Sequence, residues 1–173
     1  LILPNPMIST PPEIKKIIGC VLLLILANIA VYFNSLKGTF QFDDLPLIQS
    51  QWVEDLEAFD RQVRFSAFEN RPVVLWTYAL NNTLGKNRVF GFHLFNLTVH
   101  IGVTLLIFLI ISRTQYLIAS RASGFPLATA LLFALHPLNT DSVSYISSRS
   151  SLLVTFFYLL ALHLFTGLFS RKS

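Results

Sequence analysis

The 173-residue sequence has few charged side chains and a single cysteine. Asp, Glu, Lys and Arg make up 13% of the residues, whereas an average soluble domain has about 25%. Together with a hydrophobic content of 53%, this excludes an ordinary globular enzyme and a disordered tail. The lone Cys20 cannot form an internal disulfide. The net charge of +4 is not gathered in a basic block, so no nucleic-acid partner is indicated.

The sequence also lacks the common motifs of soluble catalytic sites. It has no Gly-rich phosphate loop, no nucleophile elbow, no HExxH pair and no CxxCH motif for covalent haem attachment. A soluble-type hydrolase site and covalently bound haem are therefore not supported.

Long charge-free stretches are present instead. Four windows without Asp, Glu, Lys or Arg cover residues 17–36, 89–112, 122–140 and 150–170. A bilayer core of about 30 Å needs about 20 apolar residues in a helix, and in lipid the backbone groups must be paired within the segment. We therefore predict an all-α, polytopic membrane protein. It is a single membrane module over 1–173, with transmembrane helices at about 17–36, 89–112, 118–137 and 150–170.

The distribution of basic residues predicts the orientation. Lys and Arg are about twice as dense in 1–16, 113–121 and 171–173 as in the segments between the other span ends, which by the positive-inside rule predicts cytoplasmic termini. The outer loop 37–88 then faces the periplasm or the lumen, in a bacterial inner membrane or the endoplasmic reticulum. A cleaved signal peptide is the alternative for the first window. Because the first residue is Leu1 rather than Met, we expect the natural start to lie upstream.

Two helical patterns lie within the outer loop. Apolar side chains recur at helical spacing over 52–63 and again over 73–84. The second segment is too short to span a bilayer, and its Trp76 suits the membrane interface. We predict amphipathic interfacial helices lying on the membrane surface. A small helical cap packed on the bundle is the alternative.

Polar groups near the membrane cost free energy, so each cluster of them needs an explanation. Asp43 and Asp44 directly follow the first window, and paired carboxylates there suit a general base or a divalent-cation site. Two solvated loop aspartates are the structural alternative. Arg149 opens the fourth window, where it faces anions arriving at the membrane surface or snorkels from a helix end.

The histidines form the remaining polar clusters. His93 and His100 share one face of the second span with Asn96. They either bond across helices or line a cavity, or ligate haem or a related cofactor; we favour the first, because no ligand-spacing signature accompanies them. His136 precedes Pro137, which disfavours helix at His136, so the third span should end or kink there.

The order of these residues resembles a known family. The quoted motifs are Phe42-Asp43-Asp44, Arg71-Pro72, Phe92-His93-Leu94 with Asn96 and His100, and a run from His136-Pro137 through Thr140-Asp141 to Arg149 and Leu152-Leu153. They are similar to the N-terminal part of the GT-C-class membrane glycosyltransferases over roughly residues 15–169. The similarity is greatest to the O-mannosyltransferases that carry transmembrane and tetratricopeptide-repeat halves, and to their bacterial relatives.

The resemblance implies an inverting glycosyltransferase that moves a sugar from a polyprenyl-phosphate carrier to a protein Ser/Thr or other hydroxyl. It implies a catalytic role for Asp43 or Asp44, which are also the ligands if a divalent cation is used. The implied substrate- or phosphate-binding residues are Arg71, Arg149, His93, His100, His136 and Asp141. The implied partners are membrane lipid, the carrier-linked sugar, an acceptor protein and other membrane subunits.

The length of the chain leaves two interpretations open. The family's enzymes have many more membrane helices, so we expect this chain to be the N-terminal module of a longer enzyme and inactive alone. The alternative is a non-catalytic four-helix subunit of a larger membrane complex, derived from a truncated relative.

Overall fold

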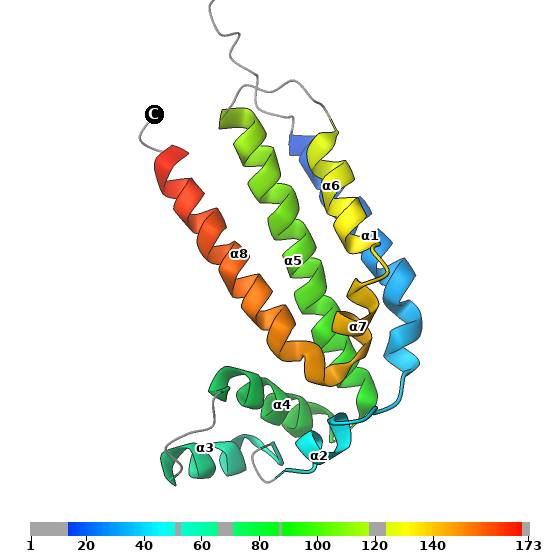
Figure 1. Cartoon of the computed structure of the whole chain (residues 1–173), viewed down its shortest axis with the longest axis vertical. Helices are drawn as coiled ribbons and strands as arrows, with labels where there is room; N and C mark the ends of the chain where they lie inside the picture. Colours follow the sequence, from blue (N-terminus) through cyan, green and yellow to red (C-terminus); the bar gives the residue numbers. More distant parts are fainter. Residues whose placement is uncertain (1–13, 51–52, 66–70, 87, 118–123, 171–173) are drawn as a thin grey trace, which may run out of the picture.

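The computed structural model describes residues 14–50, 53–65, 71–86, 88–117 and 124–170, and every regular element in these ranges is a helix. Three helices are long and apolar enough to cross a membrane: α1 (Ile14–Tyr32), α5 (Val89–Leu117) and α8 (Arg149–Ser170). They run side by side, and the start of α1 and the end of α8 lie at the same end of the bundle (Figure 1).

Helix α5 is the central helix of the bundle. It contacts α1, α6 and α8, and 39% of its most apolar window is buried, compared with 17% in α1 and 11% in α8. Gly102 provides room for this packing, because a Cβ there would lie 2.8 Å from the ring of Phe156 in α8. The outward apolar side chains of α1 and α8 match what lipid-facing helices present.

The predicted span 118–137 is not found as one helix. Residues 118–123 lie outside the described residues, and α6 (Phe125–Ala134) has only 10 residues. At 1.5 Å per residue it is about 15 Å long, half of the bilayer core. The described residues therefore contain three helices that could span a membrane, and a fourth complete span is not shown. The helix ends before Pro137, as the sequence predicts, because Pro disfavours helix in the residue that precedes it.

The chain continues beyond α6 through a turn into α7 (Asn139–Ser144) and the short η2 (Ile146–Ser148). In Figure 1 α7 follows α6 along α5 toward the start of α8, so this part of the chain is an interrupted helix. The break leaves helix-end carbonyls that need donors. The hydroxyl of Tyr32 donates to the Ala134 carbonyl at 3.2 Å, and the Asn139 amide donates to the Phe133 carbonyl. Protein groups thus replace water at the break.

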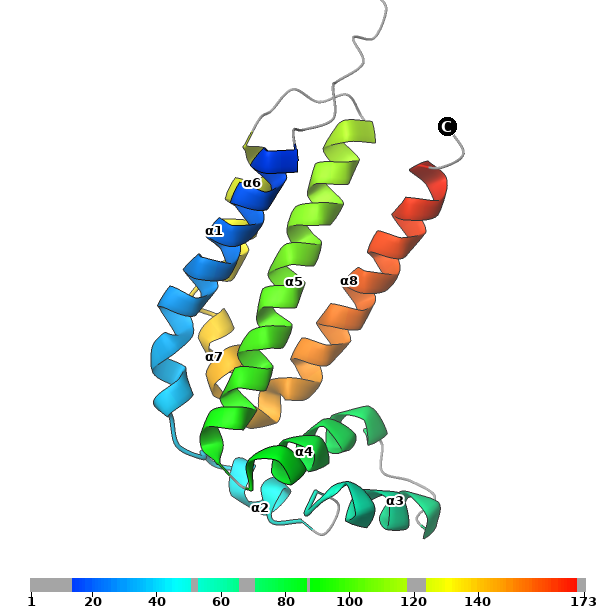
Figure 2. The same cartoon turned by 180° about the vertical axis from the view of Figure 1, so that it is seen from behind.

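The outer loop folds into a small helical cap. After η1 (Phe33–Lys37), which continues from α1, the described part of the loop contains α2 (Asp44–Ile48), α3 (Leu56–Phe65) and α4 (Pro72–Gly85). Figures 1 and 2 show α2, α3 and α4 crossing the end of the bundle opposite the start of α1. A shared apolar core joins the cap to α5 and η2, and its members are Ile48, Val53, Leu75, Tyr78, Phe92 and Ile146. Both predicted loop helices are present, and their contacts are those of a packed cap.

Candidate functional site

The two neighbouring aspartates occupy different environments. Phe42, directly before them, has a φ of +43°, a left-handed conformation that is unusual for a bulky residue. After this turn, Asp44 is fully buried at the start of α2, whereas Asp43 is exposed. Asp43 and Asp44 are therefore not interchangeable.

Asp44 fastens the cap to the start of α8. Its Oδ1 accepts hydrogen bonds from the Ser147 backbone N–H at 2.9 Å and from the Ser147 hydroxyl at 2.7 Å. Its Oδ2 accepts one from the Gln41 backbone N–H at 3.0 Å. Hydrogen bonds to a charged acceptor are stronger than neutral ones. Both oxygens are thus used to hold backbone in place.

Asp43 keeps an accessible carboxylate. The Tyr145 hydroxyl donates to its Oδ2 at 3.3 Å. The ring of Phe42, whose side chain is 87% exposed, meets the Tyr145 ring edge-on with 6.4 Å between centroids. A carboxylate that is oriented by one phenol and otherwise open to solvent can accept a proton from an incoming hydroxyl.

Arg149 lies in the interior, with no exposed surface. Its Nε donates to Asn96 Oδ1 at 2.9 Å, its Nη1 to the Thr77 hydroxyl at 3.2 Å, and its Nη2 to the Phe92 carbonyl at 3.1 Å. The guanidinium also stacks against the ring of Tyr78, at 4.2 Å from its centroid.

This geometry corrects two interpretations of Arg149. The side chain neither faces arriving anions nor snorkels, because all three of its nitrogens are engaged by α4 and α5 inside the protein. Among the described residues no carboxylate lies within ion-pair distance of it. Arg149 instead fixes the beginning of α8 against its neighbours.

Tyr78 lies between the charged groups of the site. Its hydroxyl donates to the Ile146 carbonyl at 2.7 Å. Burial raises the pKa of Tyr78 well above its usual value, while the positive charges of Arg149 and Arg71 oppose the rise and the negative charge of Asp44 adds to it. Asp44, Arg71 and Arg149 are each identified from a separate motif in the sequence, whereas no motif identifies Tyr78.

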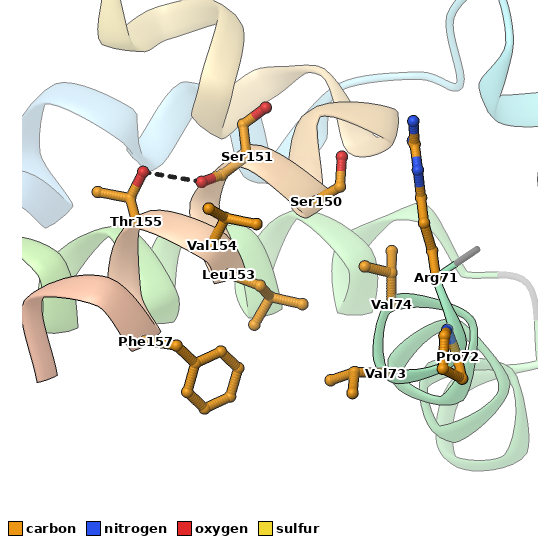
Figure 3. Close-up of a pocket in the computed structure, with 10 residues that line it drawn as sticks. All are labelled: Arg71, Pro72, Val73, Val74, Ser150, Ser151, Leu153, Val154, Thr155 and Phe157. Carbon is orange, nitrogen blue, oxygen red and sulfur yellow. Dashed lines mark hydrogen bonds between the residues drawn. The ribbon is translucent and has the colours of Figure 1, made fainter. Parts of the chain in front are cut away.

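A groove runs between the start of α4 and the first turns of α8. We call it the Arg71 groove; its volume is about 780 Å³. Figure 3 shows Arg71 on the α4 side and Ser150 on the α8 side, with apolar side chains between the two helices. The apolar lining is Val73, Val74, Leu153, Val154 and Phe157. One exposed cation beside an apolar groove suits an amphiphile with an anionic head.

The histidines do not gather at Asp43. His100 is fully buried between the rings of Tyr32 and Phe133, with centroid distances of 5.3 and 5.4 Å. His136 is exposed in the turn after α6, where its Nδ1 accepts the Leu138 N–H at 3.3 Å.

Two further predicted residues lie elsewhere around the site. His93 is buried on α5 and lines a separate cavity. Asp141 is exposed at α7, and its Oδ2 accepts the Ser148 hydroxyl at 3.4 Å.

The acidic pair does not fit a divalent cation. Both oxygens of Asp44 already face N–H and O–H donors, and a hard cation needs several convergent oxygen ligands. Within the described ranges no group of three His, Cys, Asp or Glu could hold a metal ion.

Sequence reasoning missed three residues that build the site. Tyr145 orients Asp43, Ser147 binds Asp44, and Thr77 binds Arg149. Each is a common polar residue with no motif of its own, and each acts across a long sequence separation. Only the fold brings them to their partners.

Comparison with known proteins shows which proteins this chain is related to. The chain is 31% identical over 172 residues to the protein O-mannosyl-transferase F38B6.6 of Caenorhabditis elegans, covering 91% of this chain and 25% of that protein. It is 30% identical to human protein O-mannosyl-transferase TMTC1, over 83% of this chain and 17% of the relative. The chain is homologous to the N-terminal portion of the TMTC-family protein O-mannosyltransferases. The resemblance read from the motifs is thereby confirmed.

The match covers most of this chain but only part of each relative. Human TMTC4 is 29% identical over 80% of this chain and 22% of its own length, so the chain spans about a quarter or less of these curated TMTC relatives. No family model matches the chain, and no solved structure matches it.

Proposed function

We propose that this chain is the N-terminal membrane module of a TMTC-type O-mannosyltransferase, which moves a sugar from a polyprenyl-phosphate carrier to a Ser or Thr hydroxyl of a protein. The homology to protein O-mannosyltransferases supports the reaction class. The observation that carries the proposal is the exposed Asp43 carboxylate, oriented by Tyr145 at the outer end of the bundle.

Asp43 is the general base of the proposed reaction. The acceptor hydroxyl gives its proton to the Asp43 carboxylate as its oxygen forms a bond to the anomeric carbon. The bond from that carbon to the carrier phosphate breaks on the opposite side, and its electron pair leaves with the phosphate oxygen. Attack opposite the leaving group inverts the anomeric centre. The reaction needs no electron donor or acceptor.

The Arg71 groove holds the carrier. The Arg71 guanidinium neutralises the charge that develops on the departing phosphate, and the prenyl chain lies on the apolar side chains of α4 and α8. Arg149 and Asp44 are positioning residues, because their polar atoms are bonded within the protein. The module is integral to a bilayer, with cytoplasmic termini and the cap on the lumenal or periplasmic side.

The test is sugar transfer by the full-length protein in membrane vesicles, supplied with polyprenyl-phosphate mannose and a Ser/Thr peptide. We expect Asp43→Asn to lower kcat at least 100-fold, within the usual range for loss of a general base of about 10²–10⁴. Glu54→Gln, an exposed acidic residue of the same cap, should leave transfer unchanged. Normal transfer by Asp43→Asn would refute the assignment of Asp43 as the base, and no transfer by the wild-type protein would favour a non-catalytic subunit.

The carrier assignment has its own variant. Arg71→Gln should raise the KM for the carrier by about tenfold, because an ion pair with the phosphate is lost. Lys86→Gln removes another exposed cation of the cap and should not change the KM. An equal effect of both variants would indicate only a general charge effect.

A further inference from the structure

A second cavity lies at the outer end of α1 and α5, and it shares no lining residue with the Arg71 groove. Its volume is about 270 Å³, and we call it the His93 cavity. Seven of the nine lining residues carry polar side chains, and none of the nine is Asp, Glu, Lys or Arg. Besides Tyr32 and His93, the polar ones are Asn34, Ser35, Gln41, Thr140 and Ser144.

His93 is the buried polar group of this cavity. Its side chain is 1% exposed. The carbonyl of Val143 lies near the ring, but neither ring nitrogen makes a hydrogen bond of acceptable geometry within the described part of the chain. Buried polar atoms almost always have a partner. An imidazole nitrogen at a polar cavity is therefore ready to bond a ligand.

Gly38 also lines the cavity and lies next to the His93 imidazole. A Cβ at position 38 would lie 2.9 Å from His93 Nε2 and 2.9 Å from the backbone oxygen of Ser35. The φ of Gly38 is −63°, which any residue adopts, so backbone conformation does not require glycine here. The missing side chain keeps space open beside His93 and also avoids the Ser35 carbonyl, so His93→Gln is the variant that tests the imidazole separately from the turn.

Two residues that line the cavity are neighbours in sequence of the residues that form the acidic site. Gln41 lies two residues before Asp43, and its N–H is bonded to Asp44. Ser144 directly precedes Tyr145, whose hydroxyl is bonded to Asp43. The segments that line the cavity are thus continuous with those that hold Asp43 and Asp44, and the cavity shares no lining residue with the Arg71 groove.

We propose that the His93 cavity binds the acceptor as an uncharged Ser/Thr-bearing peptide segment, an inference that rests on the proposed function. The uncharged lining does not suit a phosphate, which needs cations. Hydroxyl, amide and imidazole groups supply both donors and acceptors, as the N–H and C=O groups of a peptide require. The volume lies just below the usual range of pockets for drug-sized ligands, about 300–1,000 Å³, which suits a short peptide segment better than a prenyl chain.

The test separates acceptor binding from carrier binding in the full-length protein in membrane vesicles. Gly38→Ala places a methyl group against His93, and Gly19→Ala, where a Cβ meets nothing within 4 Å, is the matched control. We expect Gly38→Ala to raise the KM for an uncharged Ser/Thr peptide about tenfold, or about 1.4 kcal/mol. The KM for polyprenyl-phosphate mannose should stay within twofold. His93→Gln should give the same split and serves if Gly38→Ala does not fold.

A second readout uses the acceptor itself. Peptides with Asp or Lys next to the Ser/Thr should have a higher KM than uncharged ones in the wild type, because the cavity offers no counter-charge. An unchanged acceptor KM in both variants, or a shift in the carrier KM instead, would overturn the acceptor assignment while the proposed function stands. If the wild-type protein transfers no sugar at all, the proposed function fails and the acceptor site fails with it.

Discussion

Replacing Asp44 by Asn should destabilise the protein, whereas replacing Asp43 by Asn should not. The Asp44 carboxylate is fully buried and accepts three hydrogen bonds. An amide keeps one oxygen for the two Ser147 donors, but its NH₂ group then faces the Gln41 N–H, so two donors oppose each other. Losing one hydrogen bond to a charged group costs about 1.5–3 kcal/mol, and a buried donor is left unpaired. We expect a total loss of about 2–4 kcal/mol.

The free energy of unfolding can be measured by titrating SDS into mixed micelles and following helicity by circular dichroism. Asp43→Asn is the matched control: its carboxylate is exposed and accepts one long hydrogen bond, so the unfolding curve should superimpose on that of the wild type. Ser147→Ala should reproduce part of the Asp44→Asn loss. Equal stabilities of Asp43→Asn and Asp44→Asn would refute the separation of roles that the buried and exposed environments indicate.

Three other substitutions test the packing around the site. Arg149→Lys should cost about 2–3 kcal/mol in the same titration, because an ammonium group cannot reach three acceptors in fixed positions; Arg113→Lys, which removes one hydrogen bond of 3.5 Å, should cost less than half as much. Gly102→Ala should lower the unfolding free energy by about 1–3 kcal/mol through overpacking of α5 against α8, and no such loss is expected for Gly19→Ala. Burial raises the pKa of Tyr78 above its unfolded value of 10.0. The buried neutral phenol therefore contributes fully to the free energy of unfolding below pH 10, and this contribution is lost as the pH rises further. Tyr78→Phe should flatten the alkaline fall in stability, and an identical fall in the variant would contradict the assignment.

Large apolar side chains cover the outer faces of α1 and α8. Ile18 and Leu22 on α1 and Leu164 and Leu168 on α8 are large apolar side chains without protein cover. Such surfaces are costly in water and ordinary in a bilayer. The three spans therefore make sense together only inside a membrane, with the cap at one end.

The sequence determined the membrane helices because lipid imposes a rule that needs no tertiary contact. A helix that pairs its own backbone and carries about 20 apolar side chains is stable in a bilayer by itself, so charge spacing located α1, α5 and α8 closely. The rule does not fix the length of the third span: Pro137 predicts where that helix ends, but α6 is too short to cross a bilayer. There the donors that stabilise the interrupted helix, Tyr32 and Asn139, are set by the fold.

The tertiary structure alone decided what the polar residues do. From the sequence, Asp43 and Asp44 are both candidates for the same catalytic role. Arg149 is predicted from the sequence to face anions at the membrane surface. Whether a charged side chain acts on a substrate or holds the fold depends on its burial and on the donors and acceptors around it, which come from segments distant in the chain. The Ser147 hydroxyl donates a hydrogen bond to Asp44, and Arg149 donates one to Asn96. The Asp43 carboxylate remains accessible to solvent.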